Sequence, residues 1–207
     1  LPNLSSCKSP QQMMGSLIKK YYAEGAGVKP EDVYVVSIMP CTAKKYEAKR
    51  PEFSTSAGPD IDVVLTTREL AKLIDRFGID FNSLSDTPFD ELLGNTSGSG
   101  DIFAASGGVM ESALRSAYYL ITGKDLTTLE FRDVRGFEGI KEAEVTIDGL
   151  TLRLAVVNRL ANARALIEKV KKGEADYHFV EVMTCPGGCV GGGGQIHSYD
   201  SDVIRDR

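Results

Sequence analysis

The sequence lacks any apolar run long enough to cross a membrane. Its longest apolar segments, such as residues 33–39 and 61–65, are far shorter than the roughly 20 residues that a membrane-spanning helix needs. The first residues also lack the charged and apolar regions of a signal peptide. We therefore expect no membrane association and a cytoplasmic location, with a periplasmic one possible if an export signal lies on another part or on a partner.

The sequence also lacks an excess of basic residues. Its 24 Lys and Arg stand against 29 Asp and Glu, which gives a net charge of −5, and no run of like charges occurs. No basic stripe is available to neutralise phosphates, so nucleic acid is excluded as an expected partner. The 207 residues, 42% of them apolar, suffice for one sizeable core or two small ones that share an interface.

Cysteine and histidine are scarce, with four and two residues. In a reducing cytoplasm, Cys7, Cys41, Cys185 and Cys189 are expected to be ligands or buried thiols rather than disulfides. The last two lie in "CPGGCVGGGG", where the spacing suits a loop that brings two sulfurs to one metal or cluster and the glycines allow close backbone approach. A glycine-rich surface loop with incidental cysteines is an alternative. A zinc site is another, although CxxxC is unusual for zinc and neither histidine is placed to complete it.

Hydrophobic periodicity predicts an α/β fold with a mainly parallel sheet, flanking helices and one antiparallel hairpin that turns at Asp148-Gly149. The segment 33–39 reads as a strand buried on both faces. Ser9 is the expected N-cap of a helix from about Pro10 to Ala23, and Gly25 and Gly27 are expected to stop this helix. Other predicted helices are 67–77, with Leu70, Leu73, Ile74 and Phe77 on one face, 106–122, and 158–173, with Ala163, Leu166, Ile167 and Val170 inward; other strands are 61–65, 129–136, 141–147, 150–157 and 176–183.

Two predicted strands deliver cysteines just past their carboxyl ends, where ligands bind in parallel sheets. Cys41 follows strand 33–39, and Cys185 follows strand 176–183. In "IMPCTAKKYE", a helical turn after Cys41 would let Lys44 offer its ammonium to an anion beside the thiolate, or Lys44 could form a solvated pair with Glu47. Cys41, Cys185 and Cys189 are one thiolate short of the four that a cubane cluster requires. Cys7 is either the fourth or a buried apolar thiol.

These motifs together resemble the catalytic domain of iron-only (FeFe) hydrogenases. The resemblance includes "MPCTAKKYE" and "EVMTCPGGCVGGGGQIH", and in order between or before them "LSSCKSPQQM", "DIDVVLTTRELAKLID", "IFAASGGVMESALRSA", "VRGFEGIKEAEV" and "YHFVEVM". It implies that residues 1–207 are the carboxy-terminal portion of a domain with the two-lobed iron hydrogenase fold. We expect the family's first signature, of the TSCCP type, on a missing amino-terminal part or on a partner chain.

The resemblance also implies a ligand set for the H-cluster, a 4Fe-4S cubane joined to a two-iron subsite with carbon monoxide, cyanide and a bridging dithiolate. Cys41, Cys185 and Cys189 match three of the four cubane ligands, and the sulfur of Cys189 would bridge to the two-iron subsite. Cys7 matches no ligand. The remaining matches are Lys44 for one cyanide, Ser9, Pro10 and Gln11 for the other, Met39, Phe103 and Met183 for the packing around the two-iron subsite, and Ser5 for the proton path.

The implied activity is the reversible oxidation of dihydrogen to protons and electrons. The chain alone is expected to be inactive, because one cubane ligand and the proton-donating cysteine would lie in the first signature. The implied partners are a ferredoxin-type or other iron–sulfur electron carrier and the maturation enzymes. The alternative is a non-catalytic relative, either a sensory protein or an iron–sulfur assembly factor; Lys44, Met39 and Met183 argue against the assembly factor. A structural zinc protein has little support.

Overall fold

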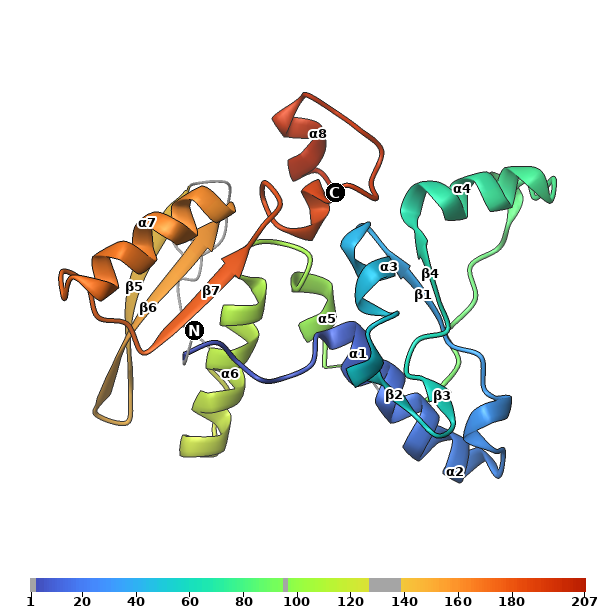
Figure 1. The fold of residues 1–207 in the computed structure, drawn as a ribbon, viewed down its shortest axis with the longest axis horizontal. Helices are drawn as coiled ribbons and strands as arrows, with labels where there is room; N and C mark the ends of the chain where they lie inside the picture. Colours follow the sequence, from blue (N-terminus) through green and yellow to red (C-terminus); the bar gives the residue numbers. More distant parts are fainter. Residues whose placement is uncertain (1–2, 95–96, 127–138) are drawn as a thin grey trace. The chain divides into compact units, whose positions relative to one another are not determined.

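The computed structural model describes residues 3–94, 97–126 and 139–207, and the chain forms two compact units (Figure 1). Unit 1 comprises residues 1–95 and 193–196, and unit 2 comprises residues 96–192 and 197–207. The predicted α/β class is confirmed, with parallel strand pairs, antiparallel strands and helices in the described residues. The strands are divided among small sheets rather than gathered in one.

Unit 1 begins with a long helical segment that is capped as the sequence predicts. Helix α1 (Pro10–Leu17) has Ser9 as its N-cap, whose Oγ accepts a hydrogen bond from the Gln12 N–H at 3.4 Å. It continues through a π-helical stretch (Ile18–Tyr22) into α2 (Ala23–Ala26). The segment ends at Gly27, which adopts the left-handed conformation that favours glycine. Gly25 lies inside the helix, so its prediction as a stop was wrong.

Two parallel strands form the centre of unit 1. Strand β1 (Val36–Met39) pairs with β4 (Val63–Thr66) in the register Val36↔Val63 to Met39↔Thr66. One face packs on a core that contains Val35, Ala48, Ile61 and Val64. The other face is exposed at Val36 (47%), Ile38 (49%) and Val63 (36%). The prediction of burial on both faces was therefore wrong, because no helix in the described part of unit 1 covers the second face.

The connections in unit 1 are short elements. Helix α3 (Ala43–Glu47) follows β1, and the two-residue strands β2 (Ser54–Thr55) and β3 (Gly58–Pro59) pair antiparallel. Helix α4 (Thr67–Arg76) follows β4 and starts with a reciprocal capping box between Thr66 and Glu69. The predicted apolar face of α4 remains largely uncovered, with Leu73 (41%) and Phe77 (71%) exposed.

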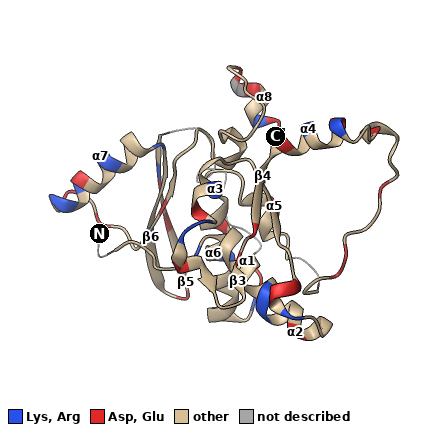
Figure 2. Cartoon of the chain, turned by 45° about the vertical axis from the view of Figure 1, so that its right-hand side comes forward, with Lys and Arg blue, Asp and Glu red and all other residues tan. Residues whose placement is uncertain are grey.

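Unit 2 is built on a three-stranded sheet. Strand β5 (Ile140–Ile147) pairs antiparallel with β6 (Leu150–Asn158), and β6 pairs parallel with β7 (Phe179–Met183). The hairpin turns at Asp148 (φ 47°) and Gly149 (φ 82°), as predicted for a type I′ turn. Helix α7 (Leu160–Lys171) connects β6 to β7 and carries both signs of charge (Figure 2). The predicted strand 129–136 lies outside the described residues.

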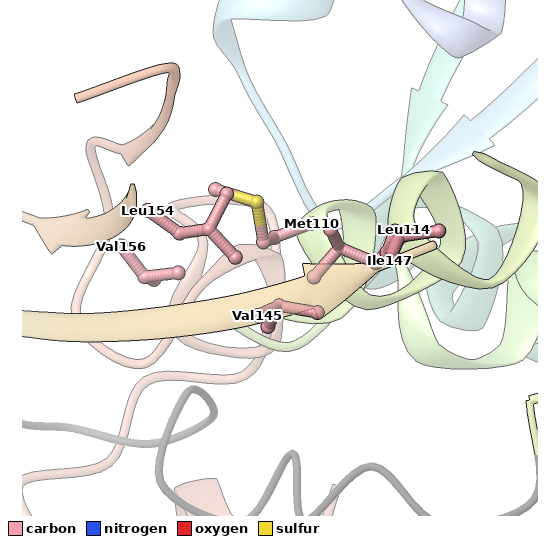
Figure 3. Close-up of a cluster of buried hydrophobic side chains, with 6 residues drawn as sticks. All are labelled: Met110, Leu114, Val145, Ile147, Leu154 and Val156. Atoms are coloured by element: carbon pink, nitrogen blue, oxygen red, sulfur yellow. The ribbon is translucent and has the colours of Figure 1, made fainter. Parts of the chain in front are cut away.

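The core of unit 2 has strand β6 at its centre. Met110 and Leu114 of α6 (Gly108–Thr122) pack with Val145 and Ile147 of β5 and with Leu154 and Val156 of β6 (Figure 3). Ala155 and Val157 face the other way and pack with Ala163 and Leu166 of α7. Burial on both faces explains why β6 reads as a continuous apolar run. Val170 of α7 is 39% exposed, so its predicted inward position was wrong.

The described residues of unit 2 also form three short elements. Helix α5 (Ser99–Ile102) precedes α6. A 3-10 turn (Cys189–Gly191) follows the cysteine pair, and helix α8 (Ser201–Arg205) lies near the carboxyl end. In the described part of each unit, a cysteine motif thus follows one strand of a parallel pair, Cys41 after β1 and Cys185 after β7.

Candidate functional site

In unit 1, the backbone around Cys41 is packed against glycines from the far end of the chain. Gly194 donates its N–H to the Pro40 carbonyl at 3.0 Å. A Cβ on Gly194 would lie 2.7 Å from the Cys41 nitrogen and 2.7 Å from the Pro40 carbonyl carbon. Arg68 holds the same glycines from the other side, because its N–H donates to Gly194 O at 3.2 Å and its Nη2 to Gly193 O at 2.8 Å. The glycine run is therefore needed for close contact with the Cys41 backbone.

Three of the residues that the resemblance assigns to cyanide ligands meet at one carboxylate. Glu47 Oε2 accepts hydrogen bonds from Lys44 Nζ at 2.7 Å, from Ser9 Oγ at 3.0 Å and from Gln11 Nε2 at 3.4 Å. The Lys44 and Glu47 side chains are only 25% and 19% exposed, so the pair is not a fully solvated one. We call Ser9, Gln11, Lys44 and Glu47 the donor cluster.

The donor cluster is fixed on its outer side by buried polar contacts. Gln11 is 4% exposed, and its Oε1 accepts a hydrogen bond from Ser37 Oγ at 2.7 Å. Ion pairs hold the helix itself, with Lys8 Nζ 2.5 Å from Asp60 and Lys19 Nζ 3.0 Å from Asp62. A rigid group of N–H and O–H donors at a helix N-terminus, next to an ammonium, is suited to bind an anion.

In unit 2, the segment Cys185–Cys189, which we call the cysteine loop, is held on two sides. Asn158, at the end of β6, donates from Nδ2 to the Cys185 carbonyl at 2.9 Å and accepts at Oδ1 from the Gly187 N–H at 3.3 Å. On the other side, the Ser106 N–H donates to Gly187 O at 2.9 Å, and the Val190 N–H donates to Ala104 O at 3.1 Å.

Gly188 has no room for a side chain in this arrangement. Its φ is 104°, and a Cβ there would lie 2.6 Å from the Ala104 carbonyl oxygen and 2.6 Å from the Ser106 nitrogen. Both of these are backbone atoms that cannot move aside easily. Gly188 thus serves close packing of the backbone on residues 104–106, whereas the predicted close approach of these glycines to a cluster stays a prediction.

A buried carboxylate lies on the strand that delivers the cysteine loop. Glu181 of β7 is 7% exposed and accepts the N–H groups of Gly107 at 2.6 Å and Met110 at 2.7 Å, at the start of α6. Burial raises the pKa of Glu181 above its ordinary value, although the two N–H donors oppose the rise. Glu181 therefore fixes α6, and with it the segment 104–106, relative to β7.

The other predicted site residues differ in burial. Met39, Phe103 and Met183 are half-buried at the ends of β1, α5 and β7, whereas Ser5 and Pro10 are exposed. Ser5 Oγ accepts a hydrogen bond from the Cys7 N–H at 3.2 Å. Cys7 is exposed, so its alternative prediction as a buried apolar thiol was wrong.

The chemistry of the donor set fits an iron–sulfur group. The three predicted ligands, Cys41, Cys185 and Cys189, are half-buried cysteines outside any disulfide, and the first two lie just past the ends of β1 and β7. Among the described residues, no group of three or more Cys, His, Asp or Glu side chains is gathered to hold a metal ion. Because Cys41 belongs to unit 1 and the other two cysteines to unit 2, their sharing of one cluster stays a prediction.

Two residues of these sites were missed by sequence reasoning. Asn158 ends an apolar strand, and Glu181 lies alone within the apolar strand "FVEVM". A polar residue inside an apolar strand is the pattern that could have marked both, since such a group needs internal hydrogen bonds if the fold buries it. Glu47 had been considered only as a partner of Lys44, and its contacts with Ser9 and Gln11 span 36–38 residues of sequence.

Comparison with known proteins decides the family. The sequence profile described as "Iron only hydrogenase large subunit, C-terminal domain" matches residues 1–193. The chain belongs to the iron-only hydrogenase family. The chain is 51% identical over 195 residues to the periplasmic Fe hydrogenase large subunit of Nitratidesulfovibrio vulgaris, a match that covers 94% of the chain and 46% of that protein.

Solved structures agree with this assignment. A variant of the FeFe-hydrogenase HydA1 from Chlamydomonas reinhardtii superposes with a TM-score of 0.83 at 42% identity, over 100% of this chain and 59% of that one. The chain also resembles the cytosolic Fe-S cluster assembly factor narfl of Danio rerio, with 36% identity over 202 residues, 95% of this chain and 49% of that protein. The chain thus spans about half the length of these curated relatives.

The relatives are named for different compartments, one periplasmic and one cytosolic. Within the part of the chain that the structure describes, no helix has the length and apolar character needed to span a membrane. Neither observation assigns a compartment to this chain.

Proposed function

We propose that the chain supplies the cluster-binding portion of an FeFe hydrogenase that interconverts dihydrogen with protons and electrons. The observation that carries the proposal is the donor cluster, in which Ser9, Gln11 and Lys44 all donate to the carboxylate of Glu47, the last residue of the helix that follows Cys41. The 51% identity with a hydrogenase large subunit supports it further.

The proposed roles divide between thiolates and donors. Cys41, Cys185 and Cys189 would hold the 4Fe-4S cubane, with Cys189 also bridging to the two-iron subsite. The bound cluster would supply the redox chemistry and the Lewis-acid centre for dihydrogen. The fourth thiolate and the proton-donating cysteine would come from outside this chain's residues.

The donor cluster would hold the two cyanides of the subsite. Lys44 has three N–H donors, and its ion pair with Glu47 uses one of them. The remaining donors can serve one anionic ligand, while the Ser9–Gln11 segment contacts the other through the first turn of α1. Met39, Phe103 and Met183 would exclude water around the subsite, and Ser5 would carry protons towards it.

The wider setting is part of the same proposal. We expect a ferredoxin-type or other iron–sulfur protein as electron carrier, maturation enzymes that deliver the two-iron subsite, and a cytoplasmic location. The second candidate is an iron–sulfur assembly factor, favoured by the 36% identity with narfl. A protein without cyanide ligands has no use for a half-buried donor cluster around Lys44, which is why we prefer the hydrogenase.

The test is dihydrogen evolution by the full-length protein after loading with iron, sulfide and a synthetic two-iron cofactor. Reduced viologen supplies the electrons. We expect Cys189→Ala to abolish activity and Lys44→Ala to lower it at least about tenfold, as expected for loss of a charged donor. Lys45→Ala is the matched control, since Lys45 instead pairs with Glu69 on the partly exposed start of α4.

The outcomes separate the candidates. Activity in the wild type and the Lys45 variant, with loss in the other two, supports the proposal. A wild-type protein that carries its cubane but evolves no dihydrogen favours the assembly factor. Equal activity in Lys44→Ala and wild type would show that the donor cluster does not serve the reaction.

A further inference from the structure

We propose that Asn158 is a positioning residue that holds the cysteine loop in its ligand-ready conformation and thereby controls how firmly the cluster is retained. The inference rests on the function proposed above. It concerns the loop Cys185–Cys189, which carries two of the three predicted cubane ligands.

Asn158 is among the most firmly fixed residues of unit 2. It is the last residue of β6 and is 1% exposed. Its backbone N–H donates to Gly139 O at 2.9 Å, and its carbonyl accepts from Asn162 Nδ2 at 2.7 Å. A side chain on such a backbone has little freedom, so its amide presents a donor and an acceptor in constant positions.

The amide of Asn158 extends the sheet beyond its last strand pair. The β6–β7 register ends with Asn158 opposite Met183, and Cys185 comes two residues later. The amide then bonds the Cys185 carbonyl and the Gly187 N–H, as the next peptide group of a neighbouring strand would. The orientation of the amide is fixed by chemistry, because a carbonyl only accepts and an N–H only donates.

The opposite edge of the loop is fixed by the segment 104–106. The Gly187 peptide is bonded on both sides, since its N–H donates to Asn158 and its carbonyl accepts from Ser106. An isolated bridge also joins Gly188 to Ala105. The cysteine loop therefore lies between two supports, and Asn158 is the one that bonds the Cys185 residue itself.

Such support matters because the loop is rich in glycine. Gly187 and Gly188 both have positive φ, and free glycine populates many other conformations. Ordering this backbone when a cluster binds would cost conformational entropy. The cost is lower if the folded chain already holds the loop in the bound conformation. Residues that orient metal ligands typically change metal affinity by about 10- to 100-fold when mutated.

The test compares Asn158→Ala and Asn158→Asp with wild type in the full-length protein, loaded anaerobically with ferrous iron and sulfide. The release of iron to a chelator is followed over time. The kinetic phase that is absent in Cys185→Ser is assigned to the cluster bound by the cysteine loop. We expect both variants to lose this iron about 10- to 100-fold faster than wild type. The aspartate keeps the volume of the side chain and the acceptor for the Gly187 N–H. It therefore serves as the test variant if the alanine variant does not fold.

Asn82→Ala is the matched control, because Asn82 is exposed in the 3-10 turn Phe81–Ser83 of unit 1 and bonds neither Asn158 nor the cysteine loop among the described contacts. We expect it to retain iron as wild type does. Thermal unfolding separates the inference from a purely structural role, which would lower the melting temperature without a selective loss of iron. Wild-type iron retention in both Asn158 variants would overturn the inference.

Failure of the proposed function would look different. In that case, the wild-type protein would take up no cluster on these cysteines. Hydrogen exchange of the metal-free protein then tests whether Asn158 positions the loop. Asn158→Ala should speed exchange of the Gly187 amide by at least about tenfold. Unchanged exchange would overturn the positioning role independently of the cluster.

Discussion

The carboxylate of Glu47 accepts a hydrogen bond from Ser9 at 3.0 Å, and this contact ties α3 to the N-terminus of α1 across 38 residues of sequence. The same oxygen is 2.7 Å from Lys44 Nζ. The helix start and the ammonium are therefore positioned by one group that lies outside the predicted ligand set.

Replacing Glu47 tests this coupling. We expect Glu47→Gln to lower the free energy of unfolding by about 1–3 kcal/mol, because a half-buried ammonium loses its charged acceptor. Urea unfolding followed by circular dichroism measures the change. The control is Glu52→Gln, which breaks the exposed pair with Arg50 and should have no measurable effect. Equal stability of the two variants would contradict the role of Glu47.

Gly194 is expected to tolerate no side chain. In Gly194→Ala, the new Cβ would meet the Cys41 nitrogen and the Pro40 carbonyl carbon at 2.7 Å, so unit 1 should lose about 1–3 kcal/mol of stability. Gly25→Ala provides a comparison of opposite sign. Gly25 lies in α2, where an added Cβ would have no described atom of another segment within 4 Å, and alanine there should stabilise by about 0.5–1 kcal/mol. Thermal unfolding of both variants checks the prediction, and a stabilising Gly194→Ala would contradict it.

Glu181 should make stability depend on pH. Its pKa in the folded chain is raised above the ordinary value of 4.5, chiefly by burial, so the folded state binds this proton more tightly than the unfolded state. The stabilisation from this proton is complete below about pH 4.5 and is lost as the pH rises through the folded pKa.

The measurement is the unfolding free energy of wild type and Glu181→Gln from about pH 4 upward. Over this window the wild type loses its proton and part of its stability, so the difference in unfolding free energy between wild type and variant should shrink as the pH rises. At neutral pH the variant should still be less stable by about 1–3 kcal/mol, because a glutamine offers one oxygen to the two N–H groups of Gly107 and Met110. A pH-independent difference would refute the raised pKa.

Arg159 has a backbone conformation that suits glycine. Its φ of 72° and ψ of 144° are strained for a residue with a side chain, at a typical cost of about 1–3 kcal/mol. Relief of the strain outweighs the extra freedom of glycine in the unfolded chain, so Arg159→Gly should stabilise by about 1 kcal/mol. Arg164→Gly, at an exposed position inside α7, should instead destabilise by about 1 kcal/mol. If both destabilise equally in thermal unfolding, the strain at Arg159 is absent.

Local features were predictable from the sequence. The Ser9 and Thr66 caps, the end of α6 at Gly123 and the Asp148-Gly149 turn depend on residues a few positions apart, so the pattern contains the cause. The positions of Cys41 and Cys185 after parallel strands follow for the same reason.

Features that depend on distant packing were not predictable. Whether Ile38 or Phe77 is covered depends on which other elements lie beside it, and the amphipathic pattern only identifies the face. The contacts of Glu181 with Gly107 and of Asn158 with Cys185 join residues 74 and 27 positions apart. A polar residue within an apolar strand marks Glu181 and Asn158 as noteworthy, but only the folded chain reveals which distant residues they bond.

Strand β6 has a kinetic consequence for unit 2. Its residues 154–157 are buried on both faces, in contact with α6 on one side and α7 on the other. Their amides can exchange with solvent only when both layers separate, which makes β6 the slowest-exchanging segment expected in this unit. Because Asn158 is the last residue of that strand, its bonds to the cysteine loop should persist until unit 2 unfolds as a whole. The rate at which the loop loses its conformation should then equal the global unfolding rate of the unit.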